Sequence, residues 1–215
     1  MVVAGKAPSA LACDINNHCY AVSSAVGADN YGVGATISIS CLYAPNSYPN
    51  FLTNELWDAS GNEQYWVEAG AISGYGYNNQ NYYSRELFWE DSRPNGGSIH
   101  FHPVEAVNPA NYYVAVTWAG NNTWDVDVNG NQYASTSQPM FSGGAVTLAG
   151  TEYTFNQGNG MRDIGHVYDV EWRSANGNWH PQNASMGADL PSGPSAYITP
   201  TYDASTSSVS WTGPC

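Results

Sequence analysis

Residues 111 to 136 read NYYVAVTWAGNNTWDVDVNGNQYAST, and this run contains two alternating segments separated by turn residues. Apolar side chains recur at every second position, which is the period of a β-strand with one face against a core. Gly120-Asn121-Asn122 and Asn129-Gly130-Asn131 are typical hairpin turns. The run therefore predicts an antiparallel meander. Its alternating apolar positions are Tyr112, Val114, Val116 and Trp118, followed by Trp124, Val126 and Val128.

Similar alternation appears elsewhere in the chain, whereas helical periodicity is nearly absent. Residues 35 to 40 read ATISIS and place Ala35, Ile37 and Ile39 on one face. Residues 166 to 172 predict another strand, with Val170 on one face and Val167 on the other, and a last strand is expected near residues 207 to 211. We predict an all-β protein, an antiparallel β-sandwich or jelly roll of the concanavalin-like type. It should form one domain over residues 1 to 215, with a groove on its concave sheet.

The composition is acidic and aromatic. Lys and Arg total 5 against 18 Asp and Glu, which gives a formal net charge of −13. Such a surface repels nucleic acid and anionic membranes, so we expect neither as a partner. It suits an acidic medium, in which protonation of carboxylates relieves the repulsion among them. The 16 Tyr and 8 Trp residues can pack in the core or line a groove for an extended polymer.

Cysteine usage predicts an oxidising, extracellular compartment. The four cysteines are an even number and form no CxxC metal pair, so we expect two disulfides in a secreted protein. Three connectivities are possible, and the short spacing favours Cys13 with Cys19, which leaves Cys41 with Cys215. Two sequons, at Asn121 and Asn183, are compatible with glycosylation.

The chain has neither a membrane-spanning run nor a signal peptide at its start. No stretch approaches the roughly 18 apolar residues of a transmembrane helix. The start, MVVAGK, lacks the charged segment and the long apolar core of a secretory signal. We therefore interpret the sequence as a mature domain, and we expect it to be a monomer.

Two glutamates stand out because each lies in an apolar, aromatic segment. Glu68 lies in YWVEAG and Glu152 in AGTEYTF. Ionised carboxyls are costly to bury, so a glutamate in such surroundings gains hydrogen bonds, has its pKa raised, or faces solvent from a half-buried strand. Two carboxyls close together cannot both ionise easily, and the protonated and ionised members of such a pair can act as acid and base. We predict Glu68 and Glu152 as a catalytic pair.

Several segments resemble the neprosin-type glutamic peptidases. The family has a Glu-Ala-Gly stretch followed by an aromatic segment that ends in Trp-x-x-Asp. It also has a strand-turn-strand segment and a Gly-Gly-Glu-Val element that carries the second catalytic glutamate. The similarity extends over roughly residues 33 to 156. The matching runs are GATISI (34 to 39), FLTNELW (51 to 57), WVEAG (66 to 70), LFWED (87 to 91), NTWDV (122 to 126) with Asn129-Gly130, and GTEY (150 to 153).

The resemblance implies a β-sandwich endopeptidase, related in fold to the fungal glutamic peptidases. Such an enzyme acts at acidic pH, needs no metal or other cofactor, and cleaves polypeptides with an activated water. Glu68 and Glu152 take the two catalytic positions under this resemblance. We expect the substrate contacts to come from the neighbouring side chains of Trp66, Trp89, Asp91 and Tyr153.

Other polar residues of the sequence fit the site less well. Glu90 and Asp91 are adjacent and face opposite ways in an extended segment, so at most one joins the groove; the resemblance favours Asp91, and an ion pair with Arg93 is an alternative for it. His100 and His102 have a spacing that could hold a metal, but a solvated strand face explains them equally well, and we predict no metal site. No Gly-x-Ser-x-Gly motif supports a serine nucleophile.

Two other functions remain open from the sequence. One is a jelly-roll glycoside hydrolase, because retaining glycosidases also use two carboxyls about 5 to 5.5 Å apart. The other is a noncatalytic, lectin-like carbohydrate-binding module, in which the glutamates would bind sugar hydroxyls. Reducing-sugar release would distinguish the first from a peptidase, and binding without product formation would identify the second.

Overall fold

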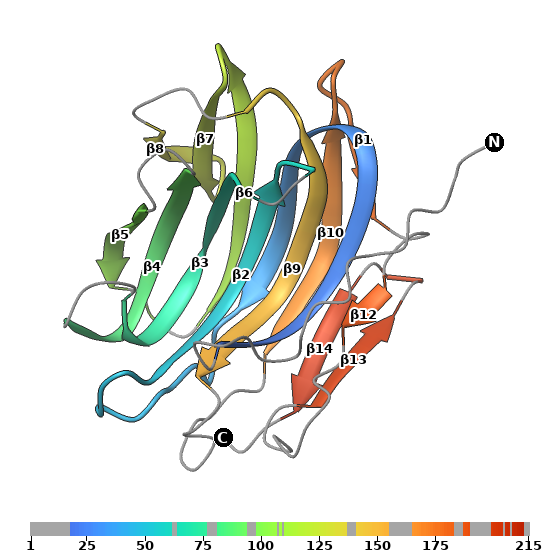
Figure 1. Ribbon diagram of the computed structural model, residues 1–215. Helices are drawn as coiled ribbons and strands as arrows, with labels where there is room; N and C mark the ends of the chain where they lie inside the picture. Colours follow the sequence, from blue (N-terminus) through green and yellow to red (C-terminus); the bar gives the residue numbers. More distant parts are fainter. Residues whose placement is uncertain are drawn as a thin grey trace.

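The computed structural model consists of strands and their connections (Figure 1). It describes residues 18–61, 64–76, 81–93, 98–106, 108, 110–136, 141–154, 165–182, 187–189, 199–203, 205–206 and 208–212. The strands are β1 His18–Ser38, β2 Phe51–Ala59, β3 Trp66–Tyr75, β4 Tyr82–Arg93, β5 Ser98–Ala106, β6 Asn111–Gly120, β7 Thr123–Val128, β8 Asn131–Ser135, β9 Gly144–Thr154, β10 His166–Ser174, β11 Trp179–Pro181, β12 Gly187–Asp189, β13 Thr199–Asp203 and β14 Ser208–Thr212. No helix of the described residues is long and apolar enough to cross a membrane.

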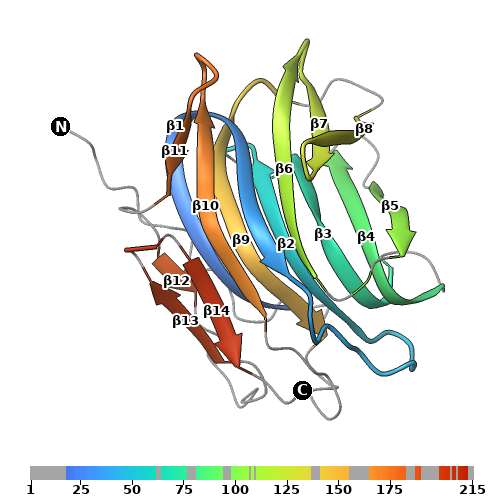
Figure 2. The same cartoon turned by 180° about the vertical axis from the view of Figure 1, so that it is seen from behind.

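The strands form two antiparallel layers that share β1. The first half of β1 pairs with β9, and the order continues through β2, β3, β4 and β5. Its second half pairs with β10 on one side and β6 on the other, and β7 and β8 follow β6. The long curved ribbon of β1 is visible in Figure 1, and Figure 2 shows β10, β6 and β7 from behind. The predicted β-sandwich is confirmed.

The meander over residues 111 to 136 is confirmed as β6, β7 and β8. Val114 pairs with Val128, as an antiparallel hairpin requires. Asn121 and Asn122 have φ values of 51° and 59°, and the next turn has 51° at Asn129 and 77° at Gly130. Two consecutive positive φ values define the type I′ turn, whose twist matches that of paired strands.

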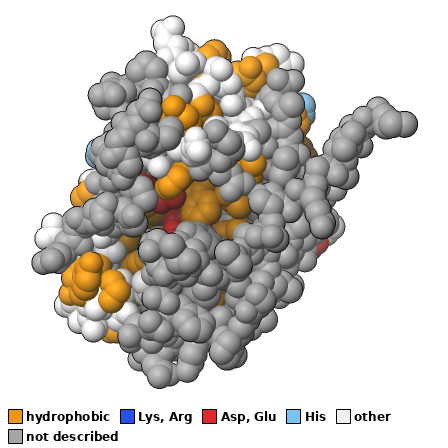
Figure 3. Space-filling view, in the orientation of Figure 1, with side chains coloured by type: hydrophobic (Ala, Val, Ile, Leu, Met, Phe, Trp, Pro, Cys, Tyr) orange, Lys and Arg blue, Asp and Glu red, His pale blue; other side chains and the backbone are white. Residues whose placement is uncertain are grey.

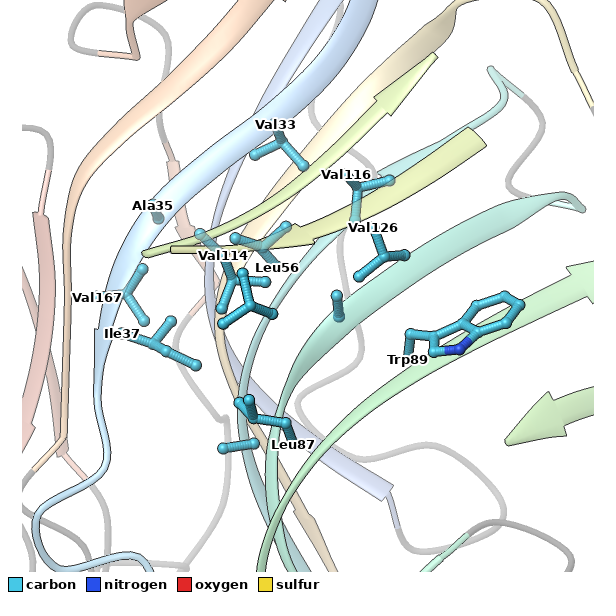
Figure 4. Packing of buried hydrophobic residues seen from close by; sticks show 14 of the residues in the cluster. Val33, Ala35, Ile37, Leu56, Leu87, Trp89, Val114, Val116, Val126 and Val167 are labelled. Atoms are coloured by element: carbon cyan, nitrogen blue, oxygen red, sulfur yellow. The ribbon is translucent and has the colours of Figure 1, made fainter. Parts of the chain in front are cut away.

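The core fills the space between the two layers. Ile37 on β1 and Val114, Val116 and Val126 of the meander lie against Leu56 of the first layer (Figure 4). Each of the four valine and leucine side chains is at most 1% exposed. Alternation therefore places every second residue of both layers in one shared core, as the sequence predicts for residues 35 to 40 and 111 to 128.

β10 departs from the predicted alternation. Uninterrupted alternation would place Val167 and Val170 on opposite faces, yet both are completely buried. Asp169 has a positive φ of 53°, and the register between β1 and β10 shifts between Gly34 and Thr36. A β-bulge at Asp169 thus turns both valines toward the core, and the burial of the second valine outweighs the backbone cost of the bulge.

The disulfide and glycosylation predictions fall largely on residues that are not described. Cys41 is disulfide-bonded. Its predicted partner Cys215, the cysteine at position 13, the side chain of Cys19 and Asn183 lie outside the described part of the structure. Asn121 is exposed in the turn between β6 and β7. The connectivity and the use of both sequons stay predictions.

We expect Asp169→Val to lower the free energy of unfolding by about 1 to 2 kcal/mol, because a β-branched residue tolerates a positive φ poorly. Asp169→Gly should be neutral or stabilising at the same position. Asp125→Val removes the same charge at a regular position of β7 and serves as the control, with a smaller effect than Asp169→Val. Urea unfolding would measure all three. An equal loss for the two valine variants would contradict the bulge.

Candidate active site

Strand alternation separates the first layer into an apolar face and an acidic face. On β2, Leu52 and Leu56 belong to the core, so Glu55 points to the other side. On β3, Val67 and Ala69 belong to the core, which leaves Glu68 on the acidic face. The same argument applies to β4 and β9. Four carboxyls share this face: Glu55 on β2, Glu68 on β3, Glu90 on β4 and Glu152 on β9.

Strand pairing brings these carboxyls together from distant parts of the sequence. Glu68 lies directly opposite Glu90 in the ladder between β3 and β4. Side chains in such a position have Cβ atoms about 4.5 to 5.5 Å apart. β2 lies between β9 and β3, so its Glu55 stands between the strands of the predicted pair, Glu68 and Glu152. The structure places both predicted glutamates in one cluster of four.

Gly70 is required for the close packing of β2 on β3. It lies opposite Glu55 in the ladder. A Cβ at position 70 would lie 2.7 Å from both Cα and Cβ of Glu55, and it would overlap the carbonyl oxygen of Asn54. Most of these contacts are with backbone atoms, which cannot turn away. The Glu-Ala-Gly segment thus combines a carboxyl with the glycine that admits the neighbouring strand.

The four carboxyls are buried. Their exposed fractions are 1% for Glu55, 6% for Glu68, 5% for Glu90 and 8% for Glu152. Burial, followed by the charge of Glu152, raises the pKa of Glu55 well above its ordinary value. Burial likewise raises the pKa of Glu68 and of Glu90, and neighbouring carboxyls add to both shifts. The cluster therefore retains protons at a pH where exposed glutamates are ionised.

Two neighbouring side chains hold the predicted pair in place. The Trp66 side chain donates a hydrogen bond to the Glu68 carboxyl and partly opposes the rise of its pKa. Thr53 Oγ1 accepts a hydrogen bond from the Glu152 backbone N–H at 3.0 Å and donates one to the Glu152 carbonyl oxygen at 3.3 Å. The predicted role of Trp66 as a substrate contact stays a prediction.

Acidic atoms are visible at the bottom of a hollow in Figure 3, and hydrophobic side chains border them. The hollow faces the viewer in the orientation of Figure 1. A buried carboxyl cluster with an opening to solvent and an apolar border is a setting in which acid and base chemistry on a bound polymer is feasible.

Three of the predicted substrate contacts lie on the wrong face. Trp89 and Tyr153 belong to the hydrophobic core, with exposed fractions of 8% and 2%. Asp91 follows the same alternation as Trp89 and is completely buried. These three side chains point away from the glutamates, so we do not retain them as substrate contacts.

Sequence reasoning missed Glu55 and Glu90, although a signal was present. Leu87 and Trp89 are apolar positions two residues apart, which assigns Asp91 to the core face and Glu90 to the opposite face. Leu52 and Leu56 give the same information about Glu55. The family resemblance favours Asp91 instead, whereas the burial of Leu87 and Trp89 in the core supports the assignment from alternation.

The histidine segment gives no support for a metal. His102 stacks on Trp89 with ring centroids 4.0 Å apart, and the side chain of His100 is not described. Within the described ranges, no group of three or more His, Cys, Asp or Glu side chains has an arrangement that could hold a metal ion.

Solved structures of glutamic peptidases share this fold. Scytalidoglutamic peptidase with a peptide-based transition-state analogue aligns with a TM-score of 0.63 at 13% identity, over 93% of this chain and 98% of that chain. The same peptidase with a transition-state analogue inhibitor gives 0.61 at 11% identity, over the same shares of both chains. SCP-B, a member of the eqolisin family of peptidases in complex with the tripeptide Ala-Ile-His, gives 0.60 at 11% identity, again over 93% and 98%. No family model and no curated protein matches the sequence. At such identities the likeness establishes the fold alone.

We expect the free energy of unfolding to fall as the pH rises from about 4.5 toward neutrality. The folded state keeps protons on Glu55, Glu68, Glu90 and the fully buried Asp58, whereas the unfolded chain releases them above about pH 4 to 4.5. Their contribution to stability is therefore complete below the unfolded pKa and is lost as the pH passes through the raised folded values.

Urea unfolding at several pH values would measure this trend. Glu90→Gln should flatten it by up to about 1.4 kcal/mol per pH unit, because the amide has no proton to lose. Asn131→Ala, an exposed change on β8 that removes no ionisable group, should leave the slope unchanged. A protein that gains stability between pH 4.5 and 7 would contradict the buried, protonated cluster.

Proposed function

We propose that this chain is an acid-acting glutamic endopeptidase in which Glu68 and Glu152 activate a water molecule. The observation that carries the proposal is that strand pairing brings Glu68 and Glu152 into one buried carboxyl cluster. The fold shared with the eqolisin-type peptidases supports it. The matching segments around both glutamates suggest the neprosin type within the glutamic peptidases.

The chemistry assigns different roles to the two carboxyls. Burial and three neighbouring carboxyls raise the pKa of Glu68, which makes it the protonated member. It donates a hydrogen bond to the carbonyl oxygen of the scissile peptide as negative charge develops there. Glu152 is then the carboxylate that accepts a proton from the attacking water.

The proton balance of this reaction closes within the pair. The water oxygen bonds to the carbonyl carbon, and its proton moves to Glu152. When the carbon–nitrogen bond breaks, that proton passes to the leaving nitrogen, so that the products are a carboxylic acid and an amine. Glu68 keeps its proton at the end of the cycle, and both residues return to their starting states.

We also propose that the protein works outside the cell in an acidic medium. The net charge of −13, the scarcity of lysine and arginine, and the disulfide at Cys41 all support this environment. A polypeptide is the proposed substrate.

We expect Glu68→Gln and Glu152→Gln each to lower kcat/KM for a peptide substrate by at least about 100-fold at acidic pH, because each removes an acid or base function. Digestion of a denatured protein between about pH 2.5 and 7 would measure the loss, with pepstatin and EDTA present. Glu171→Gln changes a half-buried carboxyl on β10 in the other layer and should retain full activity.

The alternatives predict other results. Cleavage that continues in either glutamine variant removes that residue from the mechanism. If the folded wild-type chain does not cleave protein at any pH, the peptidase proposal is wrong, and release of reducing sugar from a polysaccharide would identify a glycoside hydrolase instead.

A further inference from the structure

Glu55 occupies the middle of the carboxyl cluster. In the β2–β3 ladder it lies opposite Gly70, and in the β2–β9 ladder it lies opposite Gly150. Both partners are glycines, so no side chain stands beside Glu55 on either neighbouring strand. Glu68 is two residues from one glycine and Glu152 is two residues from the other. Glu55 is therefore a diagonal neighbour of both members of the proposed pair.

Burial of the Glu55 carboxyl does not contribute to the stability of the fold. It is 1% exposed, and neither of its oxygens has a hydrogen-bond partner among the described residues. A buried and unsatisfied carboxyl costs stability, and an aliphatic side chain would cost less. Such a group is expected where function requires it.

The charged groups around Glu55 are all acidic. Glu152 acts on it from β9, Glu68 faces it from β3, and Glu90 acts on it from β4. No described lysine, arginine or histidine contributes to its electrostatic environment. Burial and the charge of Glu152 raise the pKa of Glu55 more than the hydroxyl donor of Thr53 lowers it, so the neutral acid is the form that fits the site.

We propose that Glu55 is a positioning residue that stays protonated and, once a substrate occupies the site, donates a hydrogen bond to the catalytic pair, so that Glu152 remains ionised beside a protonated Glu68. This inference rests on the proposed function. A neutral donor stabilises the neighbouring carboxylate, whereas an ionised Glu55 would repel it. Glu55 thereby limits the peptidase to the pH range in which it keeps its own proton.

Two substitutions of similar size distinguish the loss of the hydrogen-bond donor at position 55 from the loss of its ionisable group. Glu55→Gln keeps an N–H donor and cannot ionise, so kcat/KM at about pH 4 should stay within about threefold of wild type. The pH at which its activity falls to half of the maximum on the alkaline side should rise by at least about one pH unit. Glu55→Leu has no donor, so kcat should fall at least about tenfold while KM stays within about twofold. Glu171→Leu on β10 is the control for a lost carboxyl outside the site.

Three results would overturn the inference while leaving the peptidase proposal intact. In the first, Glu55→Gln is as inactive as Glu68→Gln. In the second, Glu55→Gln loses activity at the same alkaline pH as wild type. In the third, Glu55→Leu is folded and has the kcat of wild type. Urea unfolding of each variant would verify that it is folded.

A measurement independent of activity separates the two proposals. Carbon-13 NMR of labelled glutamate carboxyls follows each proton during a pH titration of the wild-type chain. The inference predicts that Glu55 keeps its proton at a pH at which a model glutamate, with a pKa of about 4.3, is ionised. A Glu55 that ionises with the ordinary pKa of glutamate would overturn it even if the wild-type chain cleaves no peptide, and that lack of cleavage would count against the peptidase proposal alone.

Discussion

Mutual repulsion and burial of carboxyls on one face of a sheet constrain the rest of this structure. Four glutamates on four adjacent strands cannot all ionise in a site with so little access to water. They must share protons, and the sharing gives the protein both its predicted acid stability and its candidate chemistry. The same groups make neutral pH unfavourable for the fold, so stability and activity should decline in the same direction.

The sandwich can tolerate this cluster because the opposite face of the same strands is mainly apolar. The opposite face of the same strands contributes leucine, valine and tryptophan side chains to a core shared with the meander and the second half of β1. Hydrophobic burial there offsets the cost of desolvated carboxyls on the other face. Gly70 and Gly150 complete the arrangement, because they leave room for Glu55 between the strands that carry Glu68 and Glu152.

Local patterns predicted more of the fold than of the site. The turn residues and alternation of residues 111 to 136 specify a meander by themselves, since each hairpin is decided within a few residues. The local sequence does not predict the bulge at Asp169, because the bulge forms so that both valines of β10 can pack in the core. That core is built by residues far away in the sequence. The site required the pairing of β2 with β3 and β9, which a single sequence does not reveal. Alternation alone would still have placed Glu90, rather than Asp91, on the acidic face.

A crystal structure at acidic pH with a tetrahedral peptide analogue, such as a phosphinic peptide, would test the central claim most directly. The account predicts that the tetrahedral group binds in the hollow over β2, β3 and β9, with its two oxygens within hydrogen-bond distance of Glu68 and Glu152. A tetrahedral group bound elsewhere, or bound in the hollow without contact to both glutamates, would contradict the account.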